Sequence, residues 1–107
     1  MARQYGLKGL KVTLTAAGTA QQVSSTAIYA SGVEIYVPSS NTGANMYVGG
    51  SDVDSTFRPI PKQQYFSLPD TSKMGTSGRY DLREIYFDGD TTNDIIIVTY
   101  TIETQAE

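Results

Sequence analysis

The chain has no cysteine, no histidine and no tryptophan among its 107 residues. Without cysteine it can form neither disulfide bonds nor thiolate nucleophiles nor cysteine-based metal sites. Without histidine it lacks the commonest general base and the commonest transition-metal ligand. It also contains no GxSxG, SxxK or GxxxxGK[ST] motif. We therefore expect the protein not to be an enzyme, and we expect no cofactor.

Long apolar runs are absent as well. The N-terminal segment has no apolar stretch of the length that a signal peptide needs, and no other stretch could span a bilayer. We therefore expect a protein that is made in the cytoplasm and used or assembled there, without a membrane partner. Hydrophobic residues make up only 39% of the chain, so part of its stabilisation is expected to come from association with other subunits.

Positive charge is scarce and unevenly distributed. Before Glu34 the only charged residues are three cations, whereas every charged residue after Arg83 is acidic. Three scattered cations are too few for a nucleic-acid footprint, so we expect no nucleic-acid partner. Opposite charge at the two ends favours contact with another subunit, and solubility is the alternative explanation of the acidic end.

Short runs of alternating apolar and polar residues are separated by Gly, Asn, Ser and Pro. The alternation predicts strands at residues 10–15, 21–25, 27–29, 33–37, 46–48, 63–68, 82–87 and 95–104. No amphipathic helix of useful length occurs. The pattern predicts an all-β fold, a small β-sandwich or jelly roll of six to eight short antiparallel strands. We expect an extended N-terminal arm at residues 1–9, where Gly6 and Gly9 disfavour a helix, and a single domain at residues 10–107.

Two β-hairpins are predicted within this fold. The first spans residues 33–53, with Pro38 ending its first strand and Asn- and Gly-rich turn chemistry before Met46. It would bring Tyr36 and Tyr47 together as a cross-strand aromatic pair. The second joins residues 82–87 to 95–104 through the acidic segment 88–94. Phe66 and Leu68 are expected to face the core. Other apolar residues share one side of their strand: Leu10, Val12 and Leu14; Val33, Ile35 and Val37; Ile85 and Phe87; and Ile96, Val98, Tyr100 and Ile102. The strand at residues 95–104 begins apolar on both faces, so we expect it to be buried on both sides or covered by a neighbouring subunit.

Three smaller expectations concern the connections. Pro59 and Pro61 favour an extended segment or a sheet edge at residues 59–61. Asp70 is placed to cap one helical turn within residues 69–74. The Gly- and Ser-containing segment 75–78 is expected to be a flexible loop.

Two acidic clusters are candidate functional sites. Asp88, Asp90 and Asp94, with Asn93, could supply oxygen ligands to calcium, but the bidentate Glu that ends an EF-hand loop is missing. Asp, Asn and Gly are also the residues that a turn needs, and the turn interpretation is favoured. A carboxylate pair at Asp52 and Asp54 is compatible with glycoside hydrolysis, yet no further acid or stacking tryptophan accompanies it.

Residues 33–102 contain three segments that together resemble a known group of proteins. The segments EIYVPSSNTGANMYVGGSDVDST, PIPKQQYFSL and LREIYFDGDTTNDIIIVTYTI resemble small structural proteins of tailed bacteriophage virions, and YVGGSDV is the most specific motif among them. The resemblance implies a β-sandwich or jelly-roll module that coats or cements capsids, or that sits in a tail or fibre. Residues 1–32 carry no part of the resemblance.

These observations lead us to expect a capsid decoration (cement) protein. It would be made in the host cytoplasm, not secreted, and would lie on the capsid surface of the virion, bound to the major capsid protein and to copies of itself. We predict that Arg3, Tyr5, Lys8 and Lys11 bind the partner. Two alternatives remain open: a tail, neck or fibre component, and a small carbohydrate-binding module that uses exposed tyrosines for glycan contact.

Overall fold

The structure, a computed structural model, describes residues 3–68 and 79–105. The predicted helical turn at 69–74 and the predicted flexible loop at 75–78 lie outside these residues. In the described part, ten strands and one 3-10 turn make up the regular structure. In chain order they are β1 (Arg3–Thr13), β2 (Gln21–Gln22), β3 (Tyr29–Ala30), β4 (Gly32–Tyr36), β5 (Asn45–Gly49), β6 (Pro59–Pro61), β7 (Tyr65–Leu68), β8 (Tyr80–Asp81), η2 (Leu82–Glu84), β9 (Tyr86–Gly89) and β10 (Ile95–Gln105).

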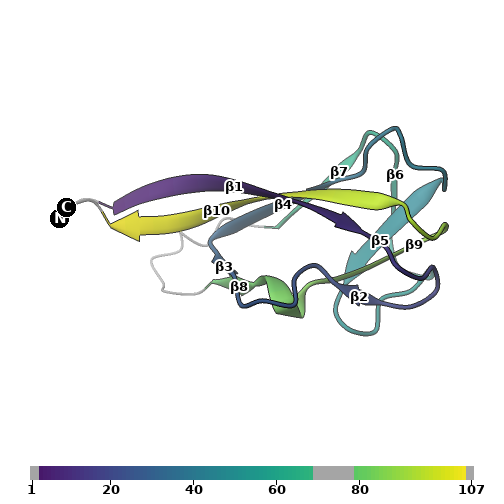
Figure 1. Cartoon of the computed structure of the whole chain (residues 1–107), viewed down its shortest axis with the longest axis horizontal. Helices are drawn as coiled ribbons and strands as arrows, with labels where there is room; N and C mark the ends of the chain where they lie inside the picture. The colour runs from purple at the N-terminus through teal and green to yellow at the C-terminus, as the bar shows by residue number, and fades with distance from the viewer. Residues whose placement is uncertain (1–2, 69–78, 106–107) are drawn as a thin grey trace.

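Two four-stranded antiparallel sheets form the body of the molecule. Sheet A has the order β1-β10-β4-β7, and sheet B has the order β2-β9-β5-β6. β3 and β8 pair as a separate two-stranded ribbon. In Figure 1, β1 (purple) and β10 (yellow) run side by side and extend farther to the left than the other labelled strands. The predicted fold class, all-β and compatible with a small β-sandwich, is confirmed.

The core consists of the inward-facing positions that the period of two predicts. Ile35, Ile96 and Val98 come from sheet A and are completely buried, as is Phe87 from sheet B. Each such side chain contributes about 1.5–3 kcal/mol when removed from water. The other buried apolar residues of this cluster are Leu14, Val23, Ala30, Val33, Val37, Met46, Ile60, Leu82, Ile85 and Tyr100, with Leu10, Val12, Phe66, Leu68 and Ile102 packed against it.

Both predicted hairpins are wrong. β4 pairs with β10 and β7, whereas β5 pairs with β6 and β9, so the chain crosses from sheet A to sheet B between β4 and β5. β9 belongs to sheet B and β10 to sheet A, so the segment between them is a second crossing. Alternation specifies which face of a strand is buried, but it does not specify the neighbouring strand.

The aromatic pairing changes with the topology. Tyr36 lies opposite Ile97 on one side and Tyr65 on the other, and not opposite Tyr47. Tyr47 is buried in sheet B, where it lies opposite Asp88 and Pro59.

The first and second-last strands also begin elsewhere than predicted. β1 starts at Arg3 rather than at residue 10, because the described part of the predicted arm pairs with β10 from Arg3↔Gln105 onward. Residues 82–84 form the 3-10 turn η2 instead of a strand, and the side chain of Asp81 caps this turn by accepting a hydrogen bond from Arg83 N. The edge at Pro59–Pro61 is confirmed as β6.

Gly89 provides a test of how closely the core packs around β9. A Cβ atom at this position would lie 2.5 Å from Met46 Sδ and 3.2 Å from a methyl group of Leu14. We therefore expect Gly89→Ala to lower the free energy of unfolding by about 1–3 kcal/mol through overpacking, measured by denaturant titration. Gly6→Ala is the control, because its Cβ would meet Ile102 at an ordinary 3.6 Å. Equal stability of the two variants would contradict this packing.

Candidate functional site

Asp88 is a buried carboxylate that fastens a distant loop to sheet B. Its side chain is 2% exposed. Its Oδ1 accepts hydrogen bonds from the backbone N–H of Gly18 (2.9 Å) and of Gly89 (2.7 Å). Gly18 has a positive φ of 90°, a conformation that favours glycine. Backbone N–H groups thus stabilise the charge of the Asp88 carboxylate, and the bond to Gly18 connects the loop after β1 to β9.

Asp94 fastens the crossing between the sheets in the same way. Its Oδ1 accepts from Thr42 N at 2.8 Å and its Oδ2 from Gly43 N at 2.7 Å. Next to it, the Asn41 amide exchanges two hydrogen bonds with the backbone of Ile95, each of 2.8 Å. The β4–β5 connection is therefore tied to the start of β10, and these long-range bonds stabilise a crossing where the sequence suggested a hairpin turn.

Asp90 is more exposed and contacts β5. Tyr47 OH donates to its Oδ1 at 2.8 Å, and Asn45 N donates to its Oδ2 at 3.1 Å. Burial of the Tyr47 ring is the main cause that raises the pKa of its hydroxyl above the ordinary value of 10.0, and the hydrogen bond to Asp90 raises it further.

The carboxylates of the acidic turn therefore point to three different sets of partners. The described part of the chain contains no group of three acidic, His or Cys side chains that could hold a metal ion. Each carboxylate instead accepts a hydrogen bond from a backbone N–H group of another segment: Asp88 from Gly18, Asp90 from Asn45 and Asp94 from Thr42.

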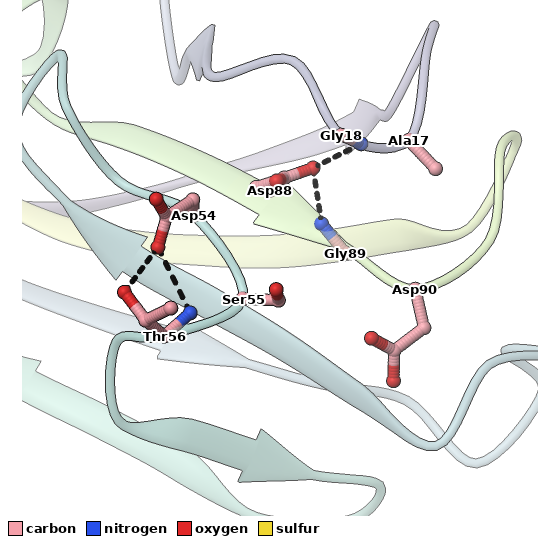
Figure 2. A pocket seen from close by; sticks show the side chains of 8 residues that line it. All are labelled: Ala17, Gly18, Asp54, Ser55, Thr56, Asp88, Gly89 and Asp90. Atoms are coloured by element: carbon pink, nitrogen blue, oxygen red, sulfur yellow. Dashed lines mark hydrogen bonds between the residues drawn. The ribbon is translucent and has the colours of Figure 1, made fainter.

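An open pocket of about 420 Å³ lies between this turn and the loop after β5. Figure 2 shows that Asp54 faces Thr56, whereas Asp88 faces Gly18 and Gly89. Asp52 is not among the lining residues, so the two acids do not form a pair in the pocket. The hydroxyl and N–H of Thr56 lower the pKa of Asp54, which is the opposite of what a glycosidase general acid requires.

The predicted partner-binding residues all lie on β1. Arg3 is opposite Gln105 and Tyr5 is opposite Glu103. Lys8 and Lys11 are exposed, and neither forms an ion pair with a described residue. Because successive residues of a strand face opposite sides, Lys8 lies on the face of sheet A that carries Tyr100, and Lys11 lies on the other face. The structure places these cations on one strand but on two faces.

The outward face of sheet A is a surface that the sequence did not reveal. On this face, one residue from each of the four strands lies opposite the next, through the pairs Lys11↔Ile97, Ile97↔Tyr36 and Tyr36↔Tyr65. We call these four residues the row. The side chain of Tyr65 is 61% exposed, and that of Leu7, on the same face, is 73% exposed. A shallow groove of about 280 Å³ runs beside this row, between Leu7, Glu34, Ser67 and Thr99. This row can be identified only when the strand order of sheet A is known. The sequence indicates it only through Ile95 and Ile97, which make both faces of β10 apolar.

Comparison of the chain with protein-family models, with curated proteins and with solved structures finds no match. No helix in the described part of the chain is long and apolar enough to cross a membrane.

Asp94 should contribute measurably to stability. Asp94→Asn replaces a buried carboxylate that accepts from two backbone N–H groups, so we expect the free energy of unfolding to fall by about 1–3 kcal/mol. Asp52→Asn is the matched control, because Asp52 is exposed, and its stability should match that of the wild type. Denaturant titration of both variants measures the effect. A fully stable Asp94→Asn variant would show that the crossing is held by other contacts.

Tyr47 should make stability fall at high pH. Its pKa is higher in the folded than in the unfolded chain, so its contribution is complete below about pH 10 and is lost as the pH rises through the folded-state pKa. Tyr47→Phe should cost about 1 kcal/mol at neutral pH and should flatten the decline in unfolding free energy as the pH rises above about 10. Tyr65→Phe, at an exposed position, should keep the wild-type profile. The expectation fails if Tyr47→Phe declines as steeply as the wild type.

Proposed function

We propose that the protein is a structural component of a tailed-phage virion, most specifically a capsid decoration protein that binds the outer surface of the major capsid subunits. The observation that carries this proposal is a four-stranded face that presents the exposed side chains of Leu7, Lys11 and Tyr65 beside the half-buried ring of Tyr36. Protein interfaces are enriched in aromatic residues relative to the rest of the surface.

The motifs that carry the resemblance to virion proteins lie mainly in the scaffold. In YVGGSDV, a Cβ atom at Gly49 would lie 3.0 Å from the Phe57 ring and 3.3 Å from Val53, so this corner packs around glycine. In IYFDG, Phe87 is completely buried and Asp88 holds Gly18. The motifs thus support a fold shared with such virion proteins. β1 lies outside the resemblance, so the choice of partner can differ there from that of other virion proteins.

Decoration needs no chemistry beyond binding. A ligand that binds the assembled lattice, and not its separate subunits, stabilises the lattice by mass action. A capsid repeats the same site many times, so a small module with a modest interface can act at each site. Lys11 lies on the outward face and has no ion-pair partner among the described residues, so it suits an acidic patch on the capsid subunit.

A carbohydrate-binding module is the second candidate, and the Tyr36–Tyr65 pair on the outward face favours it. Tyr47 cannot belong to a glycan platform because it is 6% exposed. Binding to a glycan array that is lost in a Tyr36→Ala, Tyr65→Ala double variant would support this alternative.

Charge reversal tests the decoration role. We expect Lys11→Glu to bind heads that lack the protein about tenfold more weakly, because it places an anion on the proposed binding face, against acidic patches. The control Arg58→Glu reverses an exposed cation in the loop before β6 and should bind normally. Occupancy measured on imaged particles gives the readout.

Full occupancy of the heads by the Lys11→Glu variant would remove the proposed role of this cation. Density for the chain on a tail, neck or fibre, and none on the head, would instead favour the other virion location.

A further inference from the structure

β1 is an open sheet edge of unusual length for this fold. It has eleven residues and pairs along its whole length with β10, and no described strand pairs with its other side. The other edges of the two sheets are shorter: β7 has four residues, β2 has two, and β6 is Pro59–Pro61. Long unpaired edges accept further strands, and prolines or short strands block such pairing.

The backbone groups that face this open side can be identified. Leu14 N donates to Asp94 O at 2.8 Å, in line with the β1–β10 register. Because the direction of backbone groups alternates along an antiparallel strand, the even-numbered residues of β1 bond to β10. The N–H and C=O groups of Leu7, Gly9 and Lys11 therefore point away from the molecule.

Two glycines leave this edge uncovered. A Cβ atom would meet nothing closer than 3.6 Å at Gly6 and 3.8 Å at Gly9, and neither glycine has a positive φ. The described fold therefore does not require glycine at either position. Glycine within a strand often marks close approach of another backbone. The next residue, Leu7, exposes 73% of its side chain.

We propose that a second copy of this chain pairs with β1, antiparallel and about a two-fold axis, so that two sheets A form one continuous sheet. The Gln21 side chain already donates to the carbonyl of Thr13 at 2.8 Å, so the open part of this edge lies before Thr13. The matching partner for a long edge is another long edge, and among the described strands only β1 provides one. A two-fold contact uses the same surface on both subunits and closes without forming fibres. This inference goes beyond the virion role and does not rest on it.

The positions of the cations on β1 determine which register the two β1 strands can adopt. In the proposed dimer, the outward N–H and C=O groups of one β1 must lie opposite those of the other β1. If most of the strand pairs, the two-fold axis must therefore pass at residue 7, 8 or 9. An axis at residue 7 sets Arg3 opposite Lys11, and an axis at residue 8 sets Lys8 opposite itself. Like charges directly opposite one another are destabilising. An axis at Gly9 sets Leu7 opposite Lys11 and Lys8 opposite Leu10, so no two cations face each other.

Substitution of Gly9 tests the pairing. Gly9→Pro removes an outward N–H that the β1–β10 ladder does not use, whereas Gly9→Ala retains it. In sedimentation velocity over a concentration series, the wild type and Gly9→Ala should be dimeric, and Gly9→Pro should be monomeric. Circular dichroism and thermal unfolding should show that the proline variant remains folded. A wild type that stays monomeric at all concentrations, or a dimeric proline variant, would overturn the proposal.

A cysteine trap gives a second measurement that does not depend on the proline variant. Because the chain has no cysteine, a single introduced thiol reports one position. Gly9→Cys should form a disulfide-linked dimer on mild oxidation, since opposed residues in an antiparallel pair have Cα atoms about 5.5 Å apart, within disulfide range. Ser67→Cys, on the opposite edge of sheet A, should remain uncrosslinked.

Cross-linking through Ser67→Cys and not through Gly9→Cys would overturn the β1 contact. Both measurements use the purified chain without phage particles, so their failure is separate from a failure to bind heads.

Discussion

The pairing of β10 with β1 is the interaction on which the rest of the structure depends. β10 lies between β1 and β4 and is the strand through which the N-terminal and central segments join one sheet. Its inward positions Ile96 and Val98 are completely buried. Because β1 occupies one side of β10 over its full length, sheet A ends in a long edge instead of a loop or a short strand. The proposed contacts of the protein follow from that edge and the face beside it.

The acidic C-terminal third has a role within the fold. Asp88, Asp90 and Asp94 accept hydrogen bonds from backbone N–H groups of segments that are far away in the sequence, namely two loops and the start of β5. Hydrogen bonds to charged groups are stronger than neutral ones, so a few carboxylates can fix crossings that lack regular structure. The opposite charges of the chain's ends suggested contact with another subunit. The three cations lie on β1, and among the described acidic residues after Arg83 only Glu103 lies on its partner strand β10.

The sequence predicted which residues face the core better than it predicted which strands are neighbours. The period of two correctly grouped Ile96, Val98 and Tyr100 on one face of their strand, because alternation follows directly from strand geometry, and the structure buries that face. It failed at both hairpins, because the crossings depend on long-range bonds such as that from Thr42 N to Asp94. Likewise, Lys8 and Lys11 could be identified as exposed cations, but the Tyr36–Tyr65 pair requires knowledge of the strand order.

Amide hydrogen exchange along β1 tests the central claim most directly, namely that this strand is bonded on one side and open on the other. At low protein concentration, the amides of Lys8 and Leu10 should be protected, and those of Leu7, Gly9 and Lys11 should exchange rapidly. At high concentration the second set should become protected as copies associate. Uniform protection of all five amides in the dilute chain, or rapid exchange of the second set at every concentration, would contradict the account.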